Sequence, residues 1–398
     1  MEKTVQNALF AKGGMRRVAF RFDIIRDGVK MRSIRASGSV AMDSTAQIMG
    51  SARIKTSEPV DIIKDRIRPV VMILRHNAGG AIPLKTWTEI DRAGRHAEEW
   101  DAARLSWDDL DGDVANISPR DEWIEKPVGV YLPRTCTERI EPGVNTWEIE
   151  AYDGTVLLRE DCATDRIYIA SGTRYLDAVT SVMINAGANN VLVMDDSDTV
   201  IPVDREFDIG VSKLDIVNTL LAEINFRPVS CDEDGRYIIR RYREPSPSAV
   251  DFSYLDDSLS ILRAESSSTV DLMGVPNVFI AVCDNPDLDQ TFRAEWVNDS
   301  PESPVSTINR GRNVATYRPD MISSQAEIDE YVKRTAFEAN QIYETVEIST
   351  AINPYHWANN IIVVRKGGLS GIFEETGWSF ELRAGAEMKH ALRRLVIV

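Results

Sequence analysis

The side chains that most often carry out chemistry in proteins are few and scattered in this sequence. It has four histidines, His76, His96, His356 and His390. None lies in an H-E-x-x-H motif, or in an H-x-E motif with paired cysteines downstream, so zinc hydrolysis and deamination have no support. A Ser-His-Asp triad stays open, because triads assemble across a fold, but no G-x-S-x-G motif is present. The sequence therefore predicts no catalytic residue.

The four cysteines argue against a zinc site and against a disulfide scaffold. Cys136, Cys162, Cys231 and Cys283 are far apart, and no C-x-x-C pair occurs. Structural zinc sites need closely spaced pairs of ligands. We predict four reduced, buried thiols, as in proteins made in a cytoplasm.

One acidic run resembles a calcium-binding loop. Residues 108–113 read Asp-Asp-Leu-Asp-Gly-Asp. Counted from Asp109, oxygen ligands fall at the first, third and fifth positions, but glycine is fourth instead of sixth and no glutamate closes the loop at position twelve. We predict a solvated loop and no metal site. For the acidic runs 195–198 and 256–257 we predict turns or helix caps.

Four residue pairs could be mistaken for binding motifs. Gly13-Gly14 and Gly367-Gly368 lack the G-x-G-x-x-G or G-K-[ST] context that holds phosphate groups, so we expect turns and no cofactor. Arg240-Arg241 and Arg393-Arg394 are short basic pairs in a chain of formal net charge −16. We expect them to form salt bridges on strands, because nucleic-acid sites need clustered positive charge.

Residues 86–125 interrupt the strand pattern and suggest a rival function. Tryptophans stand there among Asp, Glu and Arg, at Trp87, Trp100, Trp107 and Trp123. Such a segment could form the sugar platform of a glycan hydrolase with Asp121 and Glu122 as paired carboxylates. Adjacent residues on a strand point to opposite faces, so this pair is a poor dyad. We expect a long insertion that leaves the core of the domain (an excursion), with its tryptophans in local packing or in an interface with a partner protein.

Length and composition limit the class of protein and the number of domains. The chain has 398 residues, 43% hydrophobic and 27% charged, which predicts folded protein in two to four domains. Its 46 Lys and Arg against 62 Asp and Glu argue against a protein that coats nucleic acid or binds anionic lipid. No window of 18 apolar residues occurs and the first residues are polar, so we expect neither a membrane span nor a signal peptide.

The first third of the chain predicts strands. Val18, Phe20, Phe22 and Ile24 alternate with polar residues, and Asp27-Gly28 then predicts a hairpin turn. Further strands are expected over 29–36, 60–74, 128–132 and 145–152. After the turn at 153–154 we expect a strand at 155–158.

The middle of the chain predicts helices. Ser171 is expected to cap a helix over 172–186, and Ser212 with Asp215 predicts a second helix with Leu214, Val217, Leu220 and Leu221 on its buried face. A turn at 232–235 and a strand at 236–242 complete a small α/β module. The run Glu244-Pro-Ser-Pro-Ser predicts a linker.

The last third again predicts strands, with one helix inserted. Strands are expected over 261–264, 277–282, 345–349, 361–364, 378–382 and 392–398, with a polar stretch over 284–318. A capping box at Ser324 and Glu327 predicts a helix over 324–343. No repeat of 20–50 residues is present, which argues against a solenoid or propeller.

Two stretches of this pattern resemble the baseplate hub proteins of phage tails and related contractile injection particles. One is the helix Lys213–Phe226 followed by Asp232-Glu-Asp-Gly-Arg-Tyr; the other is Asn353-Pro354 with the strands at 361–364 and 378–382, Gly385-Ala-Glu-Met388 and Arg393-Arg-Leu-Val. The opening strands and Tyr152-Asp153-Gly154 also fit. The resemblance implies an α+β, β-rich fold, in which two tube-protein-like β-barrel domains are joined by small α/β modules and form a ring. The implied domains are 1–165, 166–245 and 246–398, with the excursion at 86–125 and a helical insertion at about 300–345.

The resemblance also implies a structural function without catalysis. Three copies would form a pseudo-hexameric ring that adapts the six-fold tail tube to the three-fold central spike and nucleates tube assembly. The implied partners are a homotrimer, a tail tube protein, a central spike protein and other baseplate proteins, with DNA or the tape measure protein only as cargo of the lumen and no membrane binding by this chain alone. The implied location is the tail baseplate of a virion, made in the cytoplasm of a host bacterium. A tail-associated glycan or peptidoglycan hydrolase and a receptor-binding tip protein stay open as alternatives.

Overall fold

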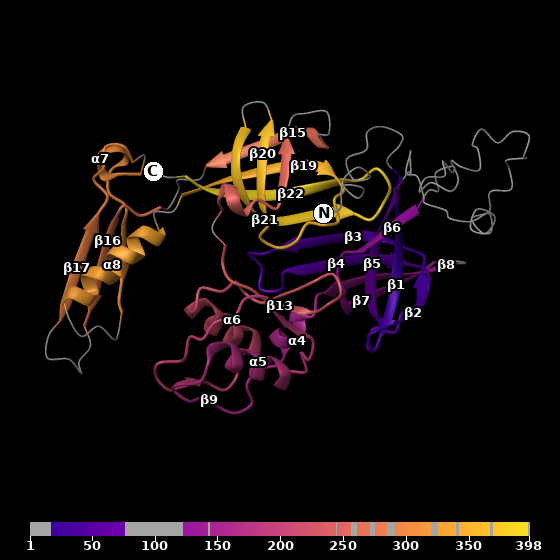
Figure 1. Ribbon diagram of the computed structural model, residues 1–398, viewed down its shortest axis with the longest axis horizontal. Coiled ribbons are helices and arrows are strands. Elements are labelled where there is room, and N and C mark those ends of the chain that lie inside the picture. The colour runs from indigo at the N-terminus through magenta and orange to yellow at the C-terminus, as the bar shows by residue number, and fades with distance from the viewer. Residues whose placement is uncertain are drawn as a thin grey trace, which may run out of the picture.

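The computed structural model describes residues 17–75, 122–141, 144–243, 245–255, 261–270, 275–284, 291–303, 305–319, 325–339, 342–366 and 369–396. Strands dominate these residues (Figure 1). Two sheets form the main body, an α/β module packs against it, and a smaller sheet with two helices extends from one end. The predicted α+β, β-rich class is confirmed.

The larger sheet has ten strands, which come from both the N-terminal and the C-terminal parts of the chain. Its order is β15-β19-β22-β21-β3-β4-β8-β7, and β20 pairs with both β21 and β14. Its strands are β3 (Ala36–Asp43), β4 (Gly50–Thr56), β7 (Leu132–Glu141), β8 (Val144–Tyr152), β14 (Phe252–Leu255), β15 (Leu262–Val270), β19 (Ile342–Ala351), β20 (Ile361–Lys366), β21 (Leu369–Glu381) and β22 (Glu387–Val396). β3 pairs antiparallel with β21, so one sheet runs through both ranges predicted as separate barrels.

A four-stranded sheet packs beside it, in the order β2-β1-β5-β6. Its strands are β1 (Val18–Arg26), β2 (Val29–Ile34), β5 (Arg66–Arg75) and β6 (Glu122–Pro127). The hairpin turn predicted at Asp27-Gly28 is confirmed, because both residues have positive φ and Arg26 pairs with Val29. Among the described strands, no pairing closes either sheet into a barrel, so the two predicted barrels are found as open sheets.

The α/β module is built from short elements around its own core. They are α4 (Thr155–Glu160), β9 (Ile167–Ile169), α5 (Tyr175–Asn185), β10 (Val191–Val193), β11 (Arg205–Phe207), α6 (Lys213–Glu223), β12 (Ser230–Cys231) and β13 (Tyr237–Ile239). The predicted cap of α6 is confirmed, since the Ser212 hydroxyl accepts from the Asp215 amide. Leu214, Val217, Leu220 and Leu221 are buried as predicted. After the module comes a short 3-10 helix, η3 (Pro247–Ala249), at the predicted linker.

Two predictions in this region are wrong. The strand expected at 155–158 is the helix α4, because the buried Asp153 carboxylate accepts from the Thr155 amide at 2.9 Å and holds the first turn. Ser171 does not cap α5, which begins at Tyr175 after Arg174. The Ser171 hydroxyl donates instead to the carbonyl of Pro202 at 3.0 Å, and so ties the chain before α5 to a neighbouring loop.

The extension consists of three strands and two helices. They are β16 (Val278–Cys283), β17 (Phe292–Val297), α7 (Thr307–Arg310), β18 (Val314–Tyr317) and α8 (Gln325–Ala339). Ile328, Val332 and Ala336 of α8 are buried against the strands, as their helical spacing predicts. β17 and β18 lie inside the stretch expected to be a polar connection. Alternation of Phe292, Ala294 and Trp296 was the missed signal for β17.

Several strand boundaries also differ from the prediction; for example, β21 begins at Leu369 instead of 378 and β22 at Glu387 instead of 392. The strand expected from residue 60 begins only at Arg66, and Ile63, ahead of it, is exposed in a turn. The strand expected over 128–132 begins at Leu132. Among the helices of the described residues, none is both long and apolar enough to span a membrane.

Candidate functional site: a buried His–Glu–His cluster

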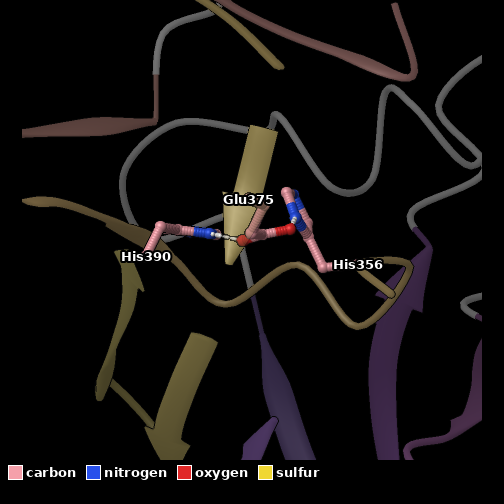
Figure 2. A group of neighbouring side chains, drawn as sticks. All are labelled: His356, Glu375 and His390. Carbon is pink, nitrogen blue, oxygen red and sulfur yellow. Dashed lines mark hydrogen bonds and ion pairs between the residues drawn. The ribbon is translucent and has the colours of Figure 1, made fainter. Parts of the chain in front are cut away.

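Two histidines converge on one glutamate inside the C-terminal half of the large sheet. His356 Nδ1 lies 2.7 Å from Oε2 of Glu375, and His390 Nδ1 lies 2.5 Å from Oε1 (Figure 2). The centroids of the two imidazole rings are 4.7 Å apart. All three side chains have no solvent exposure. We call His356, Glu375 and His390 the His–Glu–His cluster.

Local structure explains why these side chains meet. His390 lies on β22 between Met388 and Leu392, which are also buried, so strand alternation points it inward. Glu375 follows Phe373 on the inner face of β21, just ahead of a bulge in the pairing with β22. His356 comes from the loop 352–360 between β19 and β20, where it stacks on Phe252 of β14 with centroids 4.1 Å apart.

A second set of polar groups completes the hydrogen bonding. The Tyr254 hydroxyl lies 2.5 Å from His356 Nε2 and accepts from Asn353 Nδ2 at 3.2 Å. The Thr350 hydroxyl lies 2.8 Å from His390 Nε2. Every ring nitrogen of the His–Glu–His cluster therefore has a partner, as buried polar atoms require.

Burial governs the protonation of the cluster. Loss of hydration raises the pKa of Glu375 to about 7 and lowers the pKa of His356 to about 3. Burial also lowers the pKa of His390, although the hydrogen bond to Glu375 acts in the opposite direction. The environment thus favours a neutral carboxyl or a charge-balanced pair over an isolated buried charge.

The residue types would suit a metal ion, but their spacing does not. His, His and Glu form a common ligand set, and zinc–ligand distances of about 2.0–2.2 Å place neighbouring ligand atoms more than about 3 Å apart. Both facing N–O pairs here are 2.5–2.7 Å apart, which is hydrogen-bond spacing. The geometry fits a shared proton better than a metal ion.

The cluster cannot serve as an active site in this arrangement. A general base must reach the substrate atom from which it takes a proton. Here each imidazole is packed between strands and its nitrogens face protein groups. What the arrangement can do chemically is hold, gain or lose protons inside the fold.

Other residues singled out in the sequence are found in structural roles. Arg393 and Arg394 on β22 pair with Glu374 and Glu344, so the predicted strand salt bridges are confirmed there. Arg240 donates to the carbonyl of Ala358, and Arg241 donates to that of Asp196. The four cysteines are free thiols; Cys231 and Cys283 are buried as predicted, but Cys136 and Cys162 are only half-buried, so for these two the predicted burial is wrong.

Several predictions lie outside the described residues. These are His76, His96, the acidic runs 108–113 and 256–257, Asp121, three of the four tryptophans of 86–125, the capping residue Ser324, and both glycine pairs. Glu122 begins β6, and Trp123 beside it is 40% exposed. In the run 195–198, Asp196 and Asp198 pair with Arg174 at the surface.

Sequence reasoning missed the His–Glu–His cluster because no motif links its members, which come from a loop and two strands. A signal was nevertheless present. His390 and Glu375 occupy inward positions of alternating apolar strands, where an ionisable side chain must find a buried partner.

Comparison with solved structures identifies the fold. The chain is similar to a tail protein from Neisseria meningitidis MC58, with a TM-score of 0.60, 11% identity, and coverage of 94% of this chain and 97% of that one. It is also similar to the 43 kDa tail protein of prophage MuSo2 from Shewanella oneidensis, with a TM-score of 0.58, 11% identity, and coverage of 94% and 98%. No protein-family model and no curated protein matches the sequence. The predicted resemblance to phage tail proteins is thus confirmed at the level of the fold.

Proposed function

We propose that this chain is a structural component of a phage-type tail baseplate, acting as its hub. The observation that carries the proposal is the likeness to two tail proteins over 94% of this chain and nearly all of each of theirs. A match over whole chains supports a shared overall role better than a match of one module would. The division into domains at 1–165, 166–245 and 246–398 belongs to the same proposal.

In this role three copies form a pseudo-hexameric ring between a six-fold tail tube and a three-fold spike, and the ring nucleates tube assembly. Open sheet edges support association, because unpaired strand edges are natural sites for intersubunit pairing. β7 and β2 are edges of the two main sheets. β2 also exposes apolar side chains, with Val29 and Met31 each more than half exposed. Tube, spike and other baseplate proteins are the proposed partners, and DNA or the tape measure protein passes only through the lumen.

The proposed role is not catalytic. The ionisable cluster that could have served as an active site is sealed in the core. A hydrolase or receptor-binding role in residues 86–125 is the alternative, and it makes a separate prediction. Cell-wall zymography that showed clearing by the full chain, abolished by Asp121→Asn or Glu122→Gln, would favour it over the hub.

The mass of the purified chain in solution tests the hub proposal. Mass photometry alone and with the co-expressed spike and tube proteins is expected to give a trimer of about 3 × 44.6 kDa, free or bound to partners. A particle that stays monomeric in every mixture contradicts the proposal.

A further inference from the structure

The hydrogen bonds around the His–Glu–His cluster fix how many protons it holds. The Thr350 hydroxyl has one hydrogen and lies 3.0 Å from the Ala351 carbonyl, which can only accept. When Thr350 donates there, His390 Nε2 must carry a hydrogen and donate to Thr350. His390 Nδ1 then faces Glu375 Oε1 at 2.5 Å, and a proton must lie between these two atoms.

The other histidine has partners for both nitrogens in its neutral form. With the hydrogen on Nδ1, His356 donates to Glu375 Oε2, and Nε2 accepts from the Tyr254 hydroxyl. The complete network therefore contains one proton shared by Glu375 and His390, and its net charge is zero. Removing that proton buries a negative charge, and adding another buries a positive one.

His356 belongs to a loop that joins three parts of the chain. In loop 352–360, Tyr355 and Trp357 pack against the core of the N-terminal strands. Ala358 accepts from Arg240 of the α/β module, and Asn359 donates to Glu374 at 3.0 Å. Glu374 in turn pairs with Arg227 of the module. Residues 352–360 thus form a junction, and the His–Glu–His cluster fixes that junction to β21 and β22.

The surroundings of the cluster contain little that could offset a second charge. Among the described residues, Asp251 ahead of β14 is the charged group outside the cluster that acts on His356 and Glu375. Its carboxylate is already held by Arg243, Asn360 and the Ile361 amide. The groups outside the cluster that contact it are Phe252 and Tyr254 (β14) and Thr350 (β19), and Asn353 (loop 352–360) donates to the Tyr254 hydroxyl; none of the four carries a charge that could offset a second proton.

We propose that the His–Glu–His cluster makes the junction at residues 352–360 sensitive to acid, so that proton uptake opens the loop. With the loop closed, the cluster keeps one proton, because burial holds the pKa of His356 near 3. With the loop open, both histidines return to their ordinary pKa of 6.5 and bind a proton each. Opening below pH 6 therefore takes up about one proton, so its equilibrium constant rises about tenfold per pH unit.

Hydrogen exchange on the full chain tests this coupling. Exchange of a peptide covering 352–360 is measured between pH 7 and 4.5 and corrected for the intrinsic chemical rate. The amides of Tyr355 and Trp357 report on the closed loop, since both donate to side chains within it. The opening constant is expected to rise about tenfold per unit below pH 6, while peptides of α6 change much less. An opening constant that does not change with pH overturns the proposal.

Variants of the chain distinguish protonation of the His–Glu–His cluster from a general effect of acid on the fold. Replacing His356, Glu375 and His390 together by Gln removes the titrating groups, and the pH dependence at 352–360 is expected to disappear. Glu381→Gln, an exposed carboxylate on the same strand, is the matched control and should keep the dependence.

If the triple variant does not fold, ring-nitrogen NMR of the wild-type histidines decides the question. A His356 that stays a neutral Nδ1–H tautomer at pH 5 supports the proposal. Two histidines that titrate near pH 6.5 in the folded chain overturn it.

Discussion

Glu374 and Glu375 are adjacent on β21, and their carboxylates are buried on opposite faces of that strand. Glu375 binds the two histidines in the core, while Glu374 pairs with Arg227 and Arg393 on the other face. Side chains alternate along a strand, so a charged neighbour pair normally has at least one member in water. Here Arg227 of the α/β module and Arg393 of β22 pair with Glu374, so both glutamates are buried with partners.

Replacing Glu374 tests how firmly the module is attached. Glu374→Gln is expected to lower the free energy of unfolding by about 3 kcal/mol, because it leaves the largely buried Arg227 guanidinium without a counter-charge. Urea unfolding followed by circular dichroism measures the change. Glu381→Gln removes a pair with Arg383 that is exposed, so it should cost less than about 1 kcal/mol. If both substitutions lower the free energy of unfolding equally, the ion pair of Glu374 with Arg227 does not stabilise the attachment of the module.

Asp23 predicts a second acid effect, in the four-stranded sheet. Burial opposes its ionisation, but hydrogen bonds from Arg21, Lys30 and Ser33 outweigh it and lower its pKa to about 2. A folded-state pKa below the ordinary 3.8 stabilises the fold above pH 4, and this stabilisation is lost as the pH falls to 2.

The variant Asp23→Asn should reduce stability at pH 7 by roughly 2 kcal/mol, the usual contribution of hydrogen bonds to a charged group. It should also flatten the dependence of stability on pH between 4 and 2. Thermal unfolding at several pH values measures both. A variant with an unchanged slope in that range would show that Asp23 is not the titrating group.

Metal ions should leave the fold unchanged. The N–O spacing of the His–Glu–His cluster is that of hydrogen bonds, so Zn²⁺ would have to displace them and separate packed side chains. Addition of equimolar Zn²⁺ after chelator treatment is expected to change the melting temperature by less than about 1 °C, in calorimetry scans. Saturable zinc binding that His390→Gln abolishes would overturn the shared-proton interpretation.

The edge strand β2 predicts a contact between subunits. Met31 is 58% exposed on this edge, and an intersubunit strand would bury it. Met31→Lys is expected to weaken self-association at least tenfold without changing the melting temperature, measured by mass photometry over a dilution series. Ile63→Lys is the control, since Ile63 is exposed in the turn that precedes β5 and belongs to no sheet edge. Equal weakening by both would point to a general charge effect.

Local patterns predicted the elements whose partners are close in sequence. The alternation in β1, the Asp-Gly hairpin and the cap of α6 depend on residues within a few positions of one another, and all are confirmed. The helix α4 was missed because Asp153, which accepts from the Thr155 amide at the start of the helix, is held in place by the Gly50 amide, 103 positions away. The His–Glu–His cluster was missed for the same reason, since its geometry depends on how β21 and β22 pair. The prediction of closed barrels failed for the same reason, because pairing between strands far apart in the sequence, such as β3 and β21, decides whether a sheet closes.

The pairing of β3 with β21 has a consequence during synthesis. Val40 lies opposite Phe380, so one edge of the N-terminal strands receives its partner 340 positions later. At about 5–20 residues per second, a ribosome needs roughly 17–70 s to make that length. During this interval β3 presents an unpaired edge, and contacts over such a separation form slowly. A nascent chain of this protein is therefore exposed to strand-mediated aggregation until its last strands emerge, and chaperone binding in that window should raise its yield.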